Sequence, residues 1–295
     1  MANLTMRHNS QVTHAWNGTL QVTPNEAGVV LYDKDGRIAR EAVVWLDGAR
    51  NVSVGDVAVT RSAMVVSGVA SNQDGALANF IAETSGDGRV QRVIRTTPFL
   101  PVYLCALEDG TVWSYGEDRD DQLNGIQNSL RLRHYSFEKG QLSALLDVGL
   151  ERGWILSRGR YPGEISFRCN ANTIVLHNAA SSELIEFDLR SNLLRVTKVA
   201  PLPPPPEFHI TGFALTDSGE LFASLHDRSP KPAISGLFRL SRDGKDGAKW
   251  VPVDGTMGSY LHDSPIERLM GADGDDLVYT SLKDGKMFWS KRSPQ

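Results

Sequence analysis

Short runs of Val, Ile, Leu, Phe and Tyr alternate with polar residues along the whole chain, and Gly, Asp and Asn turns separate the runs. This alternation is typical of β-strands, and no stretch has the spacing of a helix longer than one or two turns. The clearest example is the range 236–256, where the sequence GLFRLSRDGKDGAKWVPVDGT places an Asp243-Gly244 turn between two strands. The pattern predicts an all-β protein.

The turn of this hairpin returns at nearly constant intervals. Equivalent turns end 51 to 53 residues apart, at Gly36, Gly88, Gly140, near Ser191 and at Gly244. A fixed period of this size, with four short strands in each unit, is typical of a β-propeller, whose blades are four-stranded sheets repeated around a central channel.

The repeat also predicts how many blades there are and how the ring closes. Six inner hairpins accompany five outer ones, because the next outer turn would fall just after Gln295. We therefore predict one domain, 1–295, that is a six-bladed β-propeller of four-stranded blades. An N-terminal strand, 3–9, is expected to complete the last blade by pairing with 286–291, since this removes two exposed sheet edges. The predicted blades are 10–46, 54–98, 101–148, 163–200, 208–254, and 265–295 together with 3–9.

Three of these units resemble the blades of known proteins. The segments GVVLYDKDGRIAREAVVW, ELIEFDLRSNLLRVTKV and GLFRLSRDGKDGAKWVPV are similar to six-bladed β-propellers, a superfamily that includes NHL-repeat, TolB-like and gluconolactonase-like proteins. The resemblance covers essentially the whole chain and indicates no specific family. It implies a binding site where the blade tops meet the central channel. The gluconolactonase-like enzymes hold a divalent metal through a Glu in the first inner strand, and the corresponding strand here keeps Trp16 but has no carboxylate.

Composition and charge narrow the classes of partner. With 41% hydrophobic and 22% charged residues, the chain is an ordinary globular protein, and its net charge of −4 gives no general attraction to nucleic acid. No apolar run reaches the length of a membrane span, and no signal peptide is recognisable. We expect a monomer without nucleic-acid or membrane partners, in the cytoplasm by default, or exported if a leader has been removed.

For the cysteines, the tryptophans and three of the arginines we expect structural roles. Cys105 and Cys169 are too few for a disulfide framework or a four-cysteine metal site, so we expect two small buried apolar side chains. The six tryptophans, spread over nearly every unit, are expected to pack between blades. Arg89, Arg92 and Arg95 alternate through an outermost strand and are expected to form a solvated edge.

Polar residues at equivalent places in neighbouring blades would converge on the channel mouth. Tyr, His and Arg are frequent in binding hot spots, and such a mouth suits a small molecule or a protein segment. Ordinary strand-end capping and loop packing is the alternative for each residue. The predicted ligand-binding residues are Tyr115, Arg160, Tyr161, His177, Asn178, His226, Asp227, Arg228, Tyr260, His262 and Asp263.

An acidic stretch in the third unit supplies a weak metal candidate. Asp118, Asp120, Asp121 and Asn124 offer the oxygen ligands that Ca²⁺ prefers, although their spacing does not match an EF-hand loop. The alternative is a solvated acidic turn. We expect no other cofactor.

No standard catalytic motif is present, neither a G-x-S-x-G elbow nor a Walker A loop nor H-E-x-x-H. The sequence therefore predicts a non-catalytic binding module with its ligand at the channel mouth. The alternative is a hydrolase or lyase that uses His177, His226 and His262, with or without a divalent metal, which requires the three imidazoles to meet. A third reading is a structural scaffold whose faces bind proteins.

Overall fold

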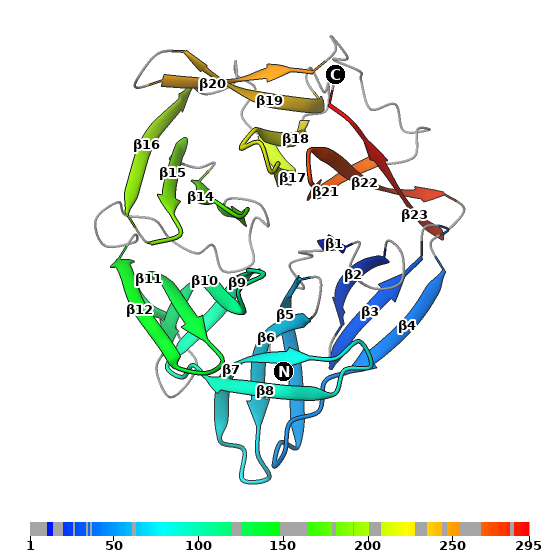
Figure 1. Cartoon of the computed structure of the whole chain (residues 1–295), viewed down its shortest axis with the longest axis vertical. Helices are drawn as coiled ribbons and strands as arrows, with labels where there is room; N and C mark the ends of the chain where they lie inside the picture. The colour runs from blue at the N-terminus through cyan, green and yellow to red at the C-terminus, as the bar shows by residue number, and fades with distance from the viewer. Residues whose placement is uncertain are drawn as a thin grey trace. The chain divides into compact units, whose positions relative to one another are not determined.

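Strands are the only regular elements among the residues that the computed structural model of the chain describes (Figure 1). The structure describes residues 11–13, 20–25, 27–33, 35, 37–60, 63–119, 125–147, 165–178, 181–190, 192–200, 208–227, 235–243, 247–253, 267–283 and 286–294. Within these ranges no helix is long and apolar enough to cross a membrane. The all-β prediction is confirmed.

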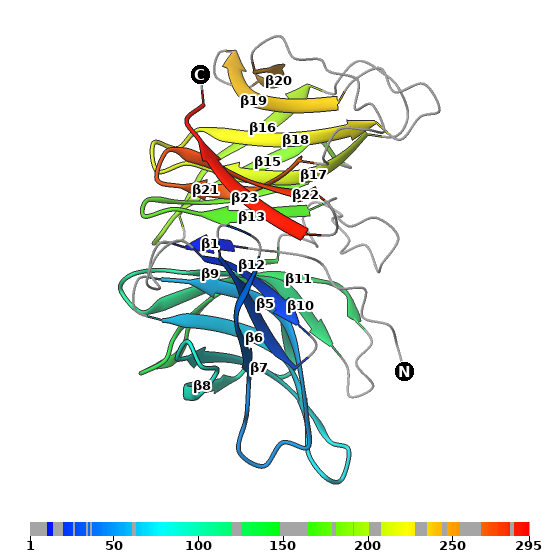
Figure 2. The same ribbon diagram turned by 90° about the vertical axis from the view of Figure 1, so that its right-hand side faces the viewer.

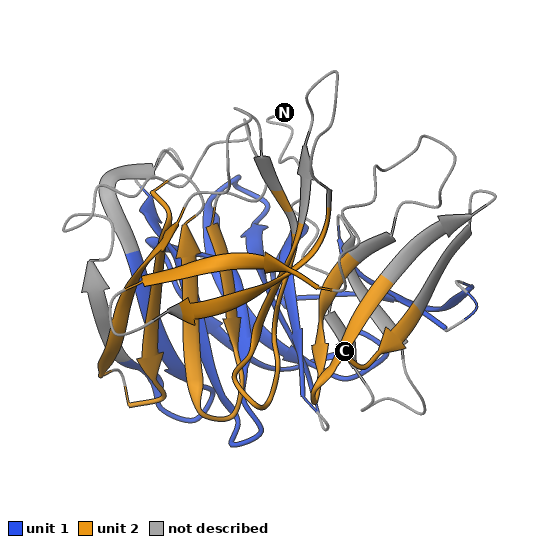
Figure 3. Ribbon diagram, turned by 90° about the horizontal axis from the view of Figure 1, so that it is seen from above, with its two compact units in different colours: residues 1–159 blue, residues 160–295 orange. Residues whose placement is uncertain are grey.

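The strands belong to two compact units, residues 1–159 and 160–295 (Figure 3). Unit 1 holds three four-stranded antiparallel sheets, in which each strand pairs with the next along the chain. The first sheet is β1 (Gln11–Thr13), β2 (Leu20–Asn25), β3 (Gly28–Tyr32) and β4 (Ile38–Val43); the second is β5 (Asn51–Val59), β6 (Met64–Ser71), β7 (Leu77–Thr84) and β8 (Val90–Arg95); the third is β9 (Phe99–Ala106), β10 (Thr111–Arg119), β11 (Gly125–Ser136) and β12 (Gly140–Asp147).

Unit 2 repeats the same strand order with two differences. Two four-stranded meanders join into a single eight-stranded sheet through parallel pairing of β16 with β20, and a three-stranded sheet follows. The meanders are β13 (Ile165–Cys169), β14 (Thr173–Asn178), β15 (Glu183–Asp188) and β16 (Leu193–Ala200), then β17 (Phe208–Leu215), β18 (Leu221–Asp227), β19 (Ser235–Asp243) and β20 (Gly247–Pro252); the last sheet is β21 (Glu267–Asp273), β22 (Asp276–Lys283) and β23 (Lys286–Arg292).

These sheets follow the blade ranges predicted from the sequence, and each four-stranded meander has the strand order of a propeller blade. The described residues give five sheets instead of six, because β16 continues to Ala200 and pairs with β20. The last sheet has three described strands, as expected. Its predicted fourth strand, 3–9, lies outside the described residues.

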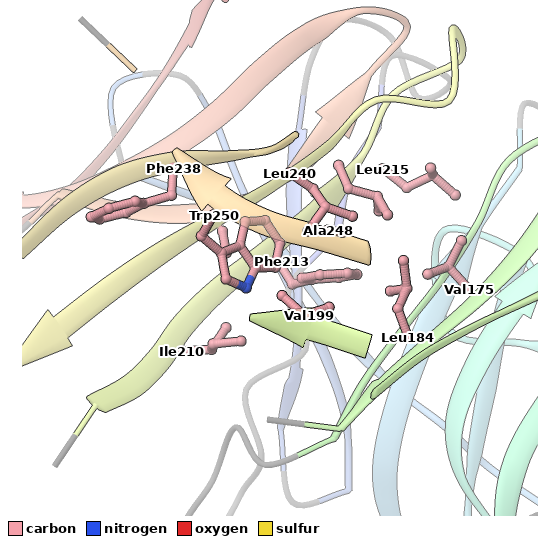
Figure 4. Packing of buried hydrophobic residues seen from close by; sticks show 12 residues of the cluster. Val175, Leu184, Val199, Ile210, Phe213, Leu215, Phe238, Leu240, Ala248 and Trp250 are labelled. Atoms are coloured by element: carbon pink, nitrogen blue, oxygen red, sulfur yellow. The ribbon is translucent and has the colours of Figure 1, made fainter. Parts of the chain in front are cut away.

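Alternating burial explains how the sheets pack within each unit. Sheet β5–β8 is buried on both faces: one packs on the first sheet through Val54, Met64 and Phe80, and the other on the third sheet through Val65 and Ile81. In unit 2 the two meanders pack around Phe213 and Trp250, which lie side by side between Val199 and Ala248 (Figure 4).

The expectation of two apolar thiols is wrong. Cys105 in β9 is buried, as predicted, but neither described cysteine is free, so neither acts only as a small hydrophobic side chain. Sequence spacing alone carries no distance information of the kind that a disulfide requires, which is why the oxidised state could not be predicted.

Candidate functional site

Tyr115 lies in the interior of a sheet. It occupies the middle of β10, has no exposed surface, and stacks on Tyr103 with ring centroids 6.4 Å apart. Burial, with a smaller contribution from Tyr103, raises the pKa of its hydroxyl far above the usual range. The residue is therefore a neutral core group and not a group at the surface of a binding site.

His177 is also enclosed. The side chain is 2% exposed and lies between Phe213, stacked at 5.7 Å, and Trp250, edge-on at 5.7 Å. Burial lowers the pKa of the imidazole to about 4, so the ring is neutral at physiological pH. Its Nδ1 atom has no hydrogen-bond partner among the described residues. The neighbouring Asn178 is buried as well, and its Oδ1 accepts a hydrogen bond from the Ser181 N–H at 3.1 Å.

Most of the other predicted ligand residues cannot be placed. The backbones of His226 and Asp227 end strand β18, where they pair with His209 and Phe208, while their side chains lie outside the described part of the chain. The remaining predicted residues are outside it altogether: Arg160, Tyr161, Arg228, Tyr260, His262 and Asp263. Of the three histidines proposed for catalysis, the structure thus describes the environment of His177 alone.

Asp118, the described member of the calcium candidate, is held by two arginines. Its Oδ2 accepts from Arg131 Nε at 2.8 Å and its Oδ1 from Arg133 Nη2 at 2.7 Å. The Arg133 guanidinium also lies 4.3 Å over the Phe99 ring. Sequence reasoning missed these partners because they come from the next strand, although their alternation places both on one face of β11. Asp120, Asp121 and Asn124 lie outside the described residues, in which no group of three His, Cys, Asp or Glu side chains could hold a metal.

A groove of about 630 Å³ opens in unit 1, at a place that the sequence did not indicate. The connection 45–49, the end of β6, the start of β7 and strand β8 line it, and the four strands of this sheet are labelled in Figure 2. Strand β7 packs on the first sheet through Phe80 and Ala82 but begins at Leu77. The extra residues extend past that cover, so Leu77 is 39% exposed and Ala78 forms part of the groove.

Trp45 stands at this groove and not between blades. Its side chain is 69% exposed, whereas the preceding Val44 is 1% exposed. Successive residues of an extended chain point to opposite sides, so burying Val44 turns Trp45 outward. After Trp45 the chain turns, with the Ala49 N–H bonded to the Leu46 carbonyl at 3.0 Å and Gly48 at a φ of 77°. The prediction of interblade packing is wrong for this tryptophan.

Arg92 and Arg95 lie in strand β8 and Arg89 directly precedes it; all three are exposed, as predicted. Arg92 is paired with Glu83 at 2.5 Å and lies 5.1 Å over the Phe137 ring. Arg89 and Arg95 form no ion pair with any residue that the structure describes. The groove therefore combines an exposed indole, aliphatic side chains, the exposed Asp47 and the guanidinium of Arg95, which has no ion-pair partner among the described residues.

Comparison with known proteins adds information on the fold only. No family model and no curated protein matches the chain. Among solved structures, the chain is similar to a member of the DUF4221 family from Bacteroides vulgatus, with 8% identity, a TM-score of 0.52, and 96% of this chain and 91% of that one covered. It is similar to a protein of unknown function from Bacteroides caccae, with 13% identity, a TM-score of 0.50 and coverages of 88% and 81%. The β-propeller domain of the Trilobed protease from Pyrococcus furiosus also matches, with 9% identity, a TM-score of 0.44 and coverages of 82% and 66%.

Proposed function

We propose that the chain is a six-bladed β-propeller that acts as a non-catalytic binding module. The three described strands of the last sheet support this architecture, because they leave one place for the predicted strand 3–9 beside β23. His226 and Asp227 are the last residues of strand β18, at a strand end as predicted for the channel mouth. We therefore retain the predicted channel-mouth residues as a second proposed contact surface.

The observation that carries the binding function is the exposed Trp45 beside the groove of unit 1. The Trp45 ring is 69% exposed and lies next to a concave surface. A ligand that covers the ring removes it from water, and this burial stabilises the complex. The groove size lies in the range of ligand pockets, and Arg95 supplies a charged group that can orient a ligand.

The hydrolase or lyase alternative is less well supported. It requires His177 to exchange protons or bind a metal, and a general acid or base works best with a pKa near the operating pH. The His177 imidazole is enclosed by Phe213 and Trp250, and its pKa lies near 4. The environment of this ring favours a packing role.

Saturation-transfer NMR with a mixture of small aromatic and aliphatic carboxylic acids tests the binding function. We expect the folded protein to bind members of the mixture, Trp45→Ala to abolish their signals, and Leu194→Ala to retain them. Leu194 is the matched control, because it is another exposed apolar side chain, 57% exposed, in the other unit. The proposal is wrong if no signal depends on Trp45.

A further inference from the structure

The outer edge of β8 has main-chain groups that its own sheet does not use. The Thr96 N–H donates to the Asn79 carbonyl at 2.8 Å, and Phe80 lies opposite Arg95. Neighbouring residues of an antiparallel strand direct their N–H and C=O groups to opposite edges. Arg92 and Ile94 therefore share the inward direction of Thr96, while Val93 and Arg95 direct theirs away from β7. The register shifts between Arg92 and Val90, so this alternation does not extend to Gln91.

Unit 2 shows what can occupy such an edge. There the end of β16 runs parallel to the start of the outer strand β20, in the pairs Lys198 with Gly247, Val199 with Ala248 and Ala200 with Lys249. In unit 1 the chain that follows β4 makes a single parallel bridge, Trp45 with Arg89, and then turns away. In the described chain, the β8 edge beyond Arg89 is left without a second strand.

The charge on this edge selects the strand that can pair with it. Arg89 and Arg95 are uncompensated within the described residues, and the Val93 side chain between them is 53% exposed. A second copy pairing through the same edge would bring arginines against arginines, which is unfavourable. A strand that alternates carboxylates with apolar side chains would neutralise the guanidiniums and cover Val93.

We propose that the β8 edge docks an extended acidic segment of a partner protein by β-strand addition, with the groove beside Trp45 receiving one of its apolar side chains. This inference rests on the proposed binding function and adds the class of partner. Main-chain hydrogen bonds to Val93 and Arg95 supply affinity, and the side-chain contacts supply selectivity.

Selection from a random peptide library on the folded protein tests the class of ligand. We expect enriched sequences in which Asp or Glu alternates with apolar residues, and we expect replacement of those acids by Lys to weaken binding at least ten-fold. Enrichment of basic or uncharged peptides, or no enrichment at all, would overturn the proposal.

Two pairs of variants test the mode of binding by fluorescence anisotropy with the selected peptide. Val93→Pro removes an N–H that the folded sheet does not use, so it should fold normally and bind at least ten-fold more weakly, whereas Val93→Thr keeps the N–H and should bind within two-fold of the parent. Arg95→Glu should weaken binding at least ten-fold, and Arg190→Glu, an exposed arginine in unit 2, should not.

Equal binding by Val93→Pro and Val93→Thr would overturn strand addition, and circular dichroism checks that both variants are folded. The outcome is separable from that of the binding function. Carboxylic acids that bind through Trp45 while acidic peptides do not would contradict the peptide proposal and leave the binding function in place. Loss of both would contradict both.

Discussion

Two junctions between neighbouring meanders follow the same plan and differ in composition. The aliphatic junction, where sheet β1–β4 packs on sheet β5–β8, consists of Val, Leu, Ala and Met side chains with Phe80 as its one aromatic member among the described residues. The aromatic junction, where β13–β16 packs on β17–β20, contains Phe213, Phe238 and Trp250 and encloses the imidazole of His177.

Their outer edges differ as well. At the aromatic junction the end of β16 makes three parallel pairs with β20, and β20 ends at Pro252, which has no N–H to offer. At the aliphatic junction the connection pairs once, through Trp45, and the β8 edge continues as far as Arg95. A few residues at the end of one meander, or just after it, therefore decide whether the outer edge of the next meander is partly covered or available to a partner.

Gly88→Ala should destabilise the aliphatic junction, with the largest expected loss in the free energy of unfolding of the three changes. A Cβ at Gly88 would lie 2.5 Å from the Val43 carbonyl oxygen, and its φ of 84° is unfavourable for any side chain. We expect a loss of about 4 kcal/mol in the free energy of unfolding, measured by chemical denaturation. Gly75→Ala is the matched control, with a φ of 82° and no atom within 4 Å, and should cost about 1 kcal/mol. Similar losses in the two variants would show that contact with Val43 does not matter.

Acid should weaken the aromatic junction through His177. The pKa of this imidazole is about 4 in the folded protein and 6.5 when the ring is exposed, so the unfolded chain binds more protons between these values. Stability is therefore fully present above pH 6.5 and is lost as the pH falls toward 4, by about 3 kcal/mol in total. Chemical denaturation across this range measures the loss. His177→Phe should flatten that part of the profile, and an unchanged profile in this variant would contradict the assignment.

The repeat could be predicted because its signals are local. The turns ending at Gly88 and Gly140 require φ values of 84° and 74°, which glycine adopts readily, and such residues are visible in the sequence. The strands between them alternate over short ranges. The ranges of the four-stranded meanders and the three described strands of the last sheet follow from that spacing without knowledge of any contact between sheets.

The candidate site could not be predicted, because burial of polar residues depends on distant strands. In β14 the residues Ile174 to Asn178 are all buried, so a histidine near the strand end has no sequence mark that separates it from an exposed one. Tyr115 in β10 is another buried polar residue without such a mark. The exposure of Trp45 follows from its position in the strand pattern. Ala42 and Val44 are both 1% exposed, so the residues that alternate with them, from the polar Glu41 to Trp45, face outward.

Arg168→Met tests how the inner strands of the two units are linked, and its expected loss of stability is the smallest of the three. In unit 2 the Arg168 guanidinium donates to the carbonyls of Phe167 at 2.8 Å, Phe213 at 3.0 Å and Met270 at 3.4 Å, so one cation links β13, β17 and β21. In unit 1 the link between inner strands is an anion, with Asp56 Oδ2 accepting from the Leu104 N–H at 2.7 Å.

Methionine retains the length of the side chain and removes every donor, which leaves the three carbonyls without this partner. We expect a loss of about 2 kcal/mol in the free energy of unfolding, since hydrogen bonds from a charged donor are stronger than neutral ones. Arg168→Lys keeps the charge but has no planar fork to reach three acceptors, so it should fall between Arg168→Met and the parent. Arg190→Met removes an exposed arginine and is expected to change stability by less than about 0.5 kcal/mol. If Arg168→Met and Arg190→Met were equally mild, the guanidinium link would be dispensable, and the apolar packing of Phe213 against Trp250 would hold the aromatic junction without it.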